Sequence, residues 1–143
     1  MIEMKGRWLG LDPGEKKIGL ALSDPLGLFA QPFKMITFRG KRDLLAQLSE
    51  IVEKEGVKGL VIGLALNKDG KAGKVAQQAK ELADFLQKKL NLPCKMMDER
   101  YSSKQAESLL KSGKVSPRKQ KTLTHQLSAA IILQTFLESE SRL

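Results

Sequence analysis

A strand–turn–strand pattern near the start of the chain constrains the fold more than any other part of the sequence. In LGLDPGEKKIGLALSD, residues 9–24, two apolar runs of strand-favouring residues are separated by a polar turn. We expect a strand over residues 7–12, a turn over 13–16 and an antiparallel strand over 17–24. Gly14 is expected to give the turn its backbone freedom.

The rest of the chain predicts alternating strands and helices. Helical spacing of leucines and the following Gly56 predict a helix over 41–55, and a continuous apolar run predicts a strand covered on both faces over 57–66. Ser102 and Gln105 match a capping box. The remaining expected elements are a loop over 25–32, a strand within 33–39, a polar loop over 67–73, a helix over 74–90, a short strand ending at 98–99, a helix after Ser102 broken at 113–117, and a helix over 118–138.

This order predicts an α/β fold in which three antiparallel strands precede an alternating, parallel half. The length of 143 residues suits one domain, and no linker or repeat divides it, so residues 1–143 are expected to form a single domain.

Composition narrows the class of protein. A single cysteine, Cys94, excludes a disulfide framework and a cysteine-based zinc site. The sequence shows neither a secretory signal pattern nor an apolar run long enough to cross a membrane. We therefore expect a cytoplasmic protein without a membrane partner.

The charge is strongly and unevenly basic. Lys and Arg number 25 against 16 Asp and Glu, which gives a net charge of +9. This excess favours a polyanionic partner such as nucleic acid, although a solvated surface is the alternative. Much of it lies in one short segment that contains a single acid, Glu107, and the basic residues Arg100, Lys104, Lys111, Lys114, Arg118, Lys119 and Lys121.

Two acidic positions are candidates for chemistry. Asp12 ends the first strand, where it is either a turn-capping residue or a ligand for a divalent cation such as Mg²⁺. The segment DERYSS, residues 98–103, offers a second carboxylate. Asp98 and Glu99 fall on opposite faces of a strand, so only one of them can face Asp12. Arg100 follows at a predicted helix N-terminus, which attracts phosphate, but a surface ion pair with a helix cap explains the segment equally well.

Two further segments have both a structural and a functional interpretation. GLALNKDGKAG, residues 63–73, is a flexible loop or a ligand-contacting loop at the carboxyl end of a strand, with Asn67 and Lys71 available. His125, the single histidine, shares a helical face with Ala129, Ile132 and Phe136. That face is mainly apolar, so the residues alone favour a packed side chain over a ligand.

Taken together, GLDPGEKKIGLALSD, VIGLALNKDG, DERYSS and LSAAIIL resemble the YqgF family, also called RuvX, in order and spacing. These bacterial proteins are described as pre-16S rRNA nucleases and earlier as Holliday-junction resolvases. The resemblance extends over residues 8–137. It implies a ribonuclease H-like fold with a five-stranded mixed sheet, three strands antiparallel and two parallel, flanked by helices.

The resemblance also implies site roles. Asp12 and Glu99 would hold Mg²⁺ or Mn²⁺ against a scissile phosphate. The reaction would be hydrolysis of a phosphodiester bond in 5′-end processing of pre-16S rRNA during ribosome biogenesis. Residues that would contact nucleic acid are Lys17, Asn67, Lys71 and Arg100.

The sequence departs from the family at the last helix. An aspartate usually precedes the SAxxIL run, and counting back from Ser128 places His125 there. His125 would then be the third metal ligand and catalytic residue, with manganese favoured, or the site would be weakened. Ala65 replaces a frequent proline, from which we expect an effect on loop shape alone.

Three other functions remain open at this stage. One is a resolvase acting on branched DNA, which should be a homodimer because it cuts symmetrically. The second is a nucleic-acid-binding homologue with weak catalysis. The third, a nucleotide-binding protein of the actin-like class, is disfavoured because such proteins need two domains. A ribosomal particle is a further possible partner of the nuclease.

Overall fold

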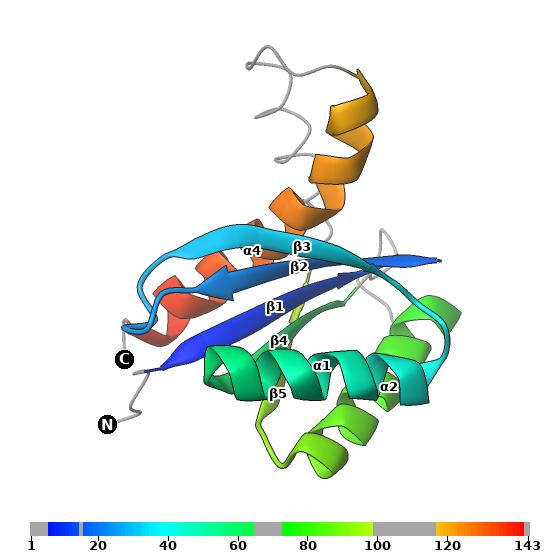
Figure 1. Cartoon of the computed structure of the whole chain (residues 1–143), viewed down its shortest axis with the longest axis horizontal. Coiled ribbons are helices and arrows are strands. Elements are labelled where there is room, and N and C mark those ends of the chain that lie inside the picture. The colour runs from blue at the N-terminus through cyan, green and yellow to red at the C-terminus, as the bar shows by residue number, and fades with distance from the viewer. Residues whose placement is uncertain (1–5, 15, 65–72, 99–116, 142–143) are drawn as a thin grey trace.

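The computed structural model describes residues 6–14, 16–64, 73–98 and 117–141. In this part of the chain, strands and helices alternate as the sequence predicts (Figure 1). The elements are β1 (Arg7–Pro13), β2 (Lys17–Ser23), β3 (Ala30–Thr37), α1 (Lys41–Glu55), β4 (Val57–Leu64), α2 (Lys74–Leu90), β5 (Cys94–Asp98) and α4 (Pro117–Ser141).

The five strands form one mixed sheet in the order β3-β2-β1-β4-β5. β1 pairs antiparallel with β2, and β2 pairs antiparallel with β3. β4 pairs parallel with β1, and β5 pairs parallel with β4. The predicted five-stranded sheet, antiparallel first and parallel afterwards, is confirmed.

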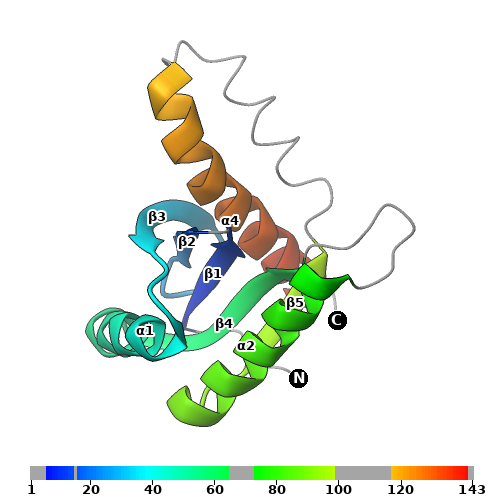
Figure 2. The ribbon, with the colours of Figure 1, turned by 90° about the vertical axis from the view of Figure 1, so that its right-hand side faces the viewer.

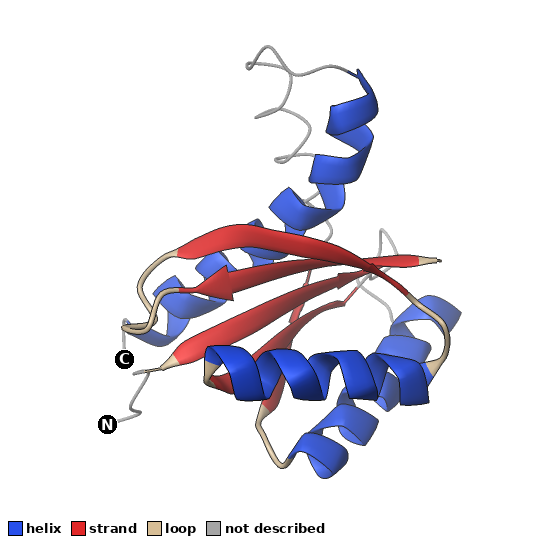
Figure 3. Ribbon diagram, in the orientation of Figure 1, coloured by secondary structure: helices blue, strands red, loops and turns tan. Residues whose placement is uncertain are grey.

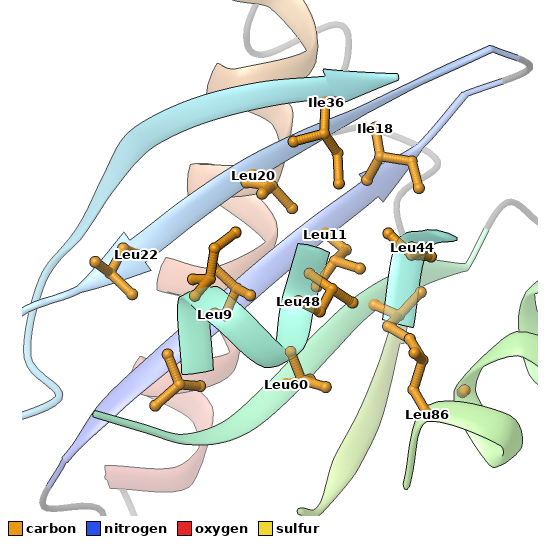
Figure 4. Close-up of a cluster of buried hydrophobic side chains, with 14 residues drawn as sticks. Leu9, Leu11, Ile18, Leu20, Leu22, Ile36, Leu44, Leu48, Leu60 and Leu86 are labelled. Atoms are coloured by element: carbon orange, nitrogen blue, oxygen red, sulfur yellow. The ribbon is translucent and has the colours of Figure 1, made fainter. Parts of the chain in front are cut away.

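The helices cover the two faces of the sheet as separate layers (Figures 2 and 3). α1 and α2 lie on one face, and α4 crosses the other. Figure 4 shows the larger core, which α1 and α2 close over leucines and isoleucines of the central strands. The second core lies under α4, where Trp8 and Phe136 place their ring centroids 5.0 Å apart.

Strand alternation explains this division. In β1, Leu9 and Leu11 are fully buried under α1 and α2, whereas Trp8 belongs to the core under α4. Gly10 and Asp12 share the face of Trp8 by the two-residue period. The central strand therefore presents large apolar groups to one layer and small or polar groups to the other.

Local signals fix most of the element ends. α1 ends at Gly56, whose φ of 68° and ψ of 42° are left-handed, and its N–H donates to the Val52 carbonyl. A residue without Cβ adopts this conformation at little cost. α2 ends in the same way at Asn91. The predicted bounds 41–55 and 74–90 are confirmed by these two helices.

β3 begins at Ala30, earlier than the predicted 33–39, and it includes Pro32. β3 has a sheet neighbour on one side among the described strands, so it is an edge strand. Proline is tolerated there because its missing N–H takes no ladder hydrogen bond away. The proline in the sequence was therefore a misleading sign of a loop.

Gly14 has another role than the one expected from its backbone freedom. Its φ does not lie in the left-handed region. A Cβ at this position would lie 2.8 Å from the Lys17 carbonyl oxygen and 3.4 Å from His125 Cε1. Gly14 is thus required for space, and its N–H donates to the Lys17 carbonyl at 2.8 Å.

The remaining predictions for elements fall partly outside the described ranges. The expected helix after Ser102 lies outside the described residues. Residues 65–66 of the strand expected over 57–66 and residue 99 of the following short strand also lie outside them. Within the described ranges, no helix is long and apolar enough to cross a membrane.

Candidate active site

Asp12 is a buried carboxylate on the central strand of the sheet. Asp12 as a whole residue is 4% exposed, and it lies opposite Gly19 of β2 in the sheet. The carboxyl end of β1 and the start of β2 meet here, because Pro13 pairs with Ile18. Burying a carboxylate in this position is costly without polar partners, so Asp12 is not a solvated turn residue and its partners matter.

One partner of Asp12 is His125 of α4. His125 Nδ1 lies 3.2 Å from Asp12 Oδ2, which is hydrogen-bonding distance. The imidazole is 44% exposed, whereas the Asp12 side chain is 6% exposed. His125 is therefore no packed core side chain: it contacts the carboxylate on one side and solvent on the other.

Glycines allow α4 to approach the sheet closely enough for this contact. A Cβ at Gly19 would collide with the His125 carbonyl group, and a Cβ at Gly10 would lie 2.9 Å from both the Ala129 carbonyl oxygen and Leu133 Cβ. The helix backbone thus rests on the strand backbone at two points. Because Gly10 and Gly19 have no side chains to keep α4 away from the sheet, His125 can reach Asp12.

The neighbouring strand β5 ends at the same edge of the sheet. Met97 packs in the core under α4, whereas Cys94 and Met96 pack against the core under α1 and α2. By alternation, Asp98 belongs to the face of α1 and α2, away from Asp12. Glu99 lies outside the described residues.

One of the four predicted nucleic-acid contacts can be placed. Lys17 is exposed at the start of β2, at the same end of the sheet as Asp12. Asn67, Lys71 and Arg100 lie outside the described ranges.

Ser128 was not singled out as a functional residue by the sequence analysis. It is fully buried on α4, one turn after His125, and its Oγ has no hydrogen-bond partner among the residues that the structure describes. A buried hydroxyl without a partner is uncommon in proteins. The signal in the sequence was one polar residue inside the apolar run LSAAIIL.

The donors at this site fit a hard or borderline divalent cation. A carboxylate oxygen and an imidazole nitrogen converge from β1 and α4. Mg²⁺ needs only one or two carboxylates with water and phosphate, and Mn²⁺ also accepts imidazole. Within the residues that the structure describes, no group of three or more His, Cys, Asp or Glu side chains could hold a metal ion.

Comparison with known proteins agrees with this architecture. The profile of the RuvX family, described as Holliday junction resolvase, matches residues 6–139. This chain belongs to the RuvX family. The resemblance inferred from its motifs is thereby confirmed.

Curated relatives extend over nearly the whole chain. A protein of Koribacter versatilis is 40% identical over 93% of this chain and 87% of its own length. One of Thermosynechococcus vestitus is 42% identical over 94% of this chain and 89% of its own length. Both are named "Putative pre-16S rRNA nuclease".

Solved structures of resolvases share the fold. Thermus thermophilus RuvC in complex with a Holliday junction has a TM-score of 0.58 at 14% identity, covering 95% of this chain and 96% of its own. The Fowlpox virus resolvase with junction DNA has a TM-score of 0.59 at 12% identity, covering 94% and 98%. The expected ribonuclease H-like fold is confirmed.

Proposed function

We propose that this chain is a cytoplasmic, divalent-metal-dependent nuclease that hydrolyses phosphodiester bonds in 5′-end processing of pre-16S rRNA. The observation that carries the proposal is the buried Asp12 carboxylate in hydrogen-bonding contact with His125 at the carboxyl end of the sheet. Membership of the RuvX family and the names of relatives at about 40% identity supply the substrate class.

Asp12 and His125 would hold Mg²⁺ or Mn²⁺. Such an ion, when bound, activates water and stabilises charge on the transferring phosphoryl group. Asp12 belongs to β1, which is paired with a strand on each side, so its backbone is held in place. Its carboxylate therefore loses little conformational freedom when it binds a metal ion. His125, half-exposed above it, can reach both the carboxylate and a group arriving from solvent.

Glu99 is proposed as the third ligand and second catalytic acid. Support comes from the alternation of β5, which assigns Met97 to the face of Asp12 and Asp98 to the opposite face. The residue after Asp98 returns to the face of Asp12 if the alternation continues. On the face of Asp12, Gly63 of β4 pairs with Met97 of β5 and contributes no side chain.

Phosphates of the RNA would be held by cations and by the ends of helices. Lys17 is exposed beside the candidate site. α1 and α2 both begin at this end of the sheet (Figure 1), and helix N-termini attract anions. We assign Asn67, Lys71 and Arg100 to the same backbone contacts, which position the substrate without reading its sequence.

The deciding experiment compares Asp12→Asn with Asp98→Asn in Mn²⁺- and Mg²⁺-dependent cleavage of an RNA that carries the 5′ flank of pre-16S rRNA. Asn keeps the size of Asp12 but removes the anionic ligand, so we expect cleavage to fall by more than roughly 100-fold. Asp98→Asn, on the opposite face of the sheet, should cleave within about twofold of the unchanged protein.

Equal cleavage by Asp12→Asn and the unchanged protein would reject the proposed site. Stabilisation by Mn²⁺ in thermal unfolding gives a readout independent of cleavage, since a ligand that binds only the folded state raises Tm. That rise should disappear in Asp12→Asn and persist in Asp98→Asn.

Resolution of branched DNA is the second candidate function. It is favoured by the family description and by the fold shared with two resolvases bound to junction DNA. A four-way DNA junction, run beside the RNA with the same two variants, separates the functions. Cleavage of the junction alone, lost in Asp12→Asn, would assign the chain to DNA and would call for a two-fold dimer.

A further inference from the structure

A loop at the end of the sheet opposite Asp12 exposes large apolar side chains. It comprises residues 25–29 between β2 and β3 and is called the apolar loop below. Leu26 is 61% exposed, Leu28 51% and Phe29 67%. Such residues ordinarily pack inside, so a cluster of three on one loop suggests a contact surface.

The loop is held in one conformation by hydrogen bonds to its backbone. Asp24 Oδ1 accepts from the N–H groups of Leu28 and Phe29, each at 2.8 Å, and Oδ2 accepts from Leu26 N–H at 3.2 Å. These bonds favour the ionised carboxylate and keep the pKa of Asp24 below its usual value. Gly27, with a φ of 72°, makes the turn that only a residue without Cβ adopts readily.

A second brace comes from α4. Gln134 Nε2 donates to the Leu28 carbonyl at 3.1 Å, and Gln134 Oε1 accepts from Ala30 N–H at 2.8 Å. Gly6 N–H also donates to the Pro25 carbonyl at 2.8 Å. The N–H groups of Leu26, Gly27, Leu28 and Phe29 therefore all donate within the protein, while the apolar side chains of the loop face solvent. A surface fixed in advance loses little entropy when it binds.

The loop carries no charge in a chain that is otherwise highly charged. Residues 25–33 read PLGLFAQPF, whereas 29% of the whole chain is Asp, Glu, Lys or Arg. Among the described residues, the charged side chains around the loop include Asp24, which accepts from the loop backbone, Glu138, which is bonded to Gln134, and Lys58, which lies beside Gly6. Nucleic acid and anionic membranes are bound by clusters of basic residues, and the apolar loop itself contains none. Interface cores between proteins are poor in charge and rich in aromatic residues.

The size of the patch indicates a transient contact. The three residues, exposed by 61%, 51% and 67%, offer roughly 360 Å² in total if each has about 200 Å² when fully exposed. A stable dimer needs about 800 Å² per partner. A second copy of this chain is therefore a poor fit, and a small apolar groove on another protein is a good one.

We infer that the apolar loop docks into an apolar groove on a protein of the ribonucleoprotein particle that carries the RNA substrate. This inference rests on the proposed function. The loop lies at the end of the sheet where β2 ends and β3 begins, whereas Asp12 lies where β1 ends, so both can be engaged at once. Docking would hold the nuclease on the particle while its other end reaches the RNA.

The test uses purified bacterial small-subunit precursor particles and protein-free precursor 16S rRNA. The double variant Leu28→Ser with Phe29→Ser removes apolar surface and keeps every backbone hydrogen bond. Glu53→Ser, an exposed change on α1, is the control. We expect the double variant to bind particles at least tenfold more weakly and to bind protein-free RNA within twofold of the unchanged protein. The control should match the unchanged protein on both.

A second variant separates loop order from apolar contact. Asp24→Ala keeps Leu28 and Phe29 but removes the three backbone bonds that fix them, so particle affinity should fall by several-fold, less than in the double variant. Raising the salt concentration should abolish RNA binding and leave a fraction of particle binding that depends on the loop, because apolar contacts are little screened.

Other outcomes overturn the inference. Unchanged particle binding by the double variant rejects it, as does equal weakening on particles and protein-free RNA. Loop-dependent self-association in sedimentation velocity would assign the surface to a second copy. Loop-dependent binding to phosphatidylcholine–phosphatidylglycerol vesicles would assign it to lipid. Binding is measured without cleavage, so failure of the proposed nuclease activity in the Asp12→Asn experiment is scored separately.

Discussion

At the scale of single residues, the proposed metal site depends on the contact between Asp12 and His125. The two are 113 positions apart, yet Oδ2 and Nδ1 lie 3.2 Å from each other. A carboxylate in this position would leave an all-oxygen donor set, which suits Mg²⁺, whereas imidazole adds a nitrogen donor that suits Mn²⁺ and other transition metals. The identity of residue 125 is therefore expected to set metal preference.

Exchanging His125 tests this expectation. In His125→Asp, stabilisation by Mg²⁺ should increase relative to stabilisation by Mn²⁺, and in His125→Ala both should decrease. His125→Ala also removes a hydrogen bond to a buried carboxylate, so the free energy of unfolding without metal should fall by about 1–2 kcal/mol. Thermal and urea unfolding with and without each metal measure these effects. An unchanged ratio of Mg²⁺ to Mn²⁺ stabilisation in His125→Asp would contradict the assignment.

Cys94 illustrates how burial controls a residue without a catalytic role. Burial, with a contribution from the nearby Asp84 carboxylate, raises the pKa of the thiol to about 11 from 9.0. The unfolded chain releases this proton near pH 9, whereas the folded chain keeps it until about pH 11. Folded protein thus binds more protons in that window, and the contribution of Cys94 to stability falls as the pH rises through it.

We therefore expect Cys94 to react slowly with iodoacetamide at pH 8, more slowly than a free thiol, because little thiolate is present. Its rate should rise up to about pH 11. Asp84→Asn removes the neighbouring negative charge and should increase the rate at pH 8. A rate at pH 8 equal to that of free cysteine would show that the thiol is not protected.

At the scale of elements, the seating of α4 on the sheet places His125. Gly10 and Gly19 bring the strands against the helix backbone, and both lie on the face of Asp12. The helix then runs towards the other end of the sheet, where Gln134 braces the apolar loop. One helix therefore links the candidate site to the proposed docking surface.

Gly19→Ala should displace α4 and disturb the site. Its Cβ would collide with the His125 carbonyl group, and overpacking of this kind costs about 2 kcal/mol. Cleavage and Mn²⁺ stabilisation should fall as His125 moves from Asp12. Gly56→Ala is the matched control: its site has open space but a φ of 68°, so strain should cost about 1 kcal/mol while the site stays intact. Equal activity loss in the two variants would show that general destabilisation, not seating, is responsible.

At the scale of the whole molecule, the two ends of the sheet carry different groups. One end gathers Asp12, Lys17 and the starts of α1 and α2, and the other carries the uncharged apolar loop (Figure 1). With a net charge of +9, the chain should bind RNA through phosphate contacts. The asymmetry predicts that these contacts concentrate at the Asp12 end.

Salt dependence of RNA binding tests where the contacts lie. We expect the logarithm of the affinity to fall linearly with the logarithm of salt concentration. Lys17→Ala should make the slope shallower by about 0.7–0.9, the value of one lost phosphate contact. Lys88→Ala, in the last turn of α2 at the opposite end, should leave the slope unchanged. Fluorescence anisotropy over a salt series gives both values, and equal slopes for the two variants would refute the asymmetry.

The sequence by itself determined most of the elements and marked Asp12 as a candidate site residue. The bounds of α1 and α2 follow from apolar periodicity and from their ends at Gly56 and Asn91, which are local signals. The turn after Asp12 and the two apolar runs that flank it are also local signals, and they predict the antiparallel pair of β1 and β2. The resemblance to the family supplied the five-stranded mixed sheet, and the structure supplied the order of its strands.

Only the tertiary structure decided which side chains meet. His125 lies among apolar residues in the sequence and was first interpreted as a packed side chain, but the helix seats on Gly10 and Gly19 and brings it to Asp12. Pro32 suggested a loop, but an edge strand tolerates it. The exposure of Leu28 and Phe29 depends on bonds from Asp24 and Gln134. Each outcome depends on contacts between segments distant along the chain, and a one-dimensional pattern records burial and turns but not which surfaces come together.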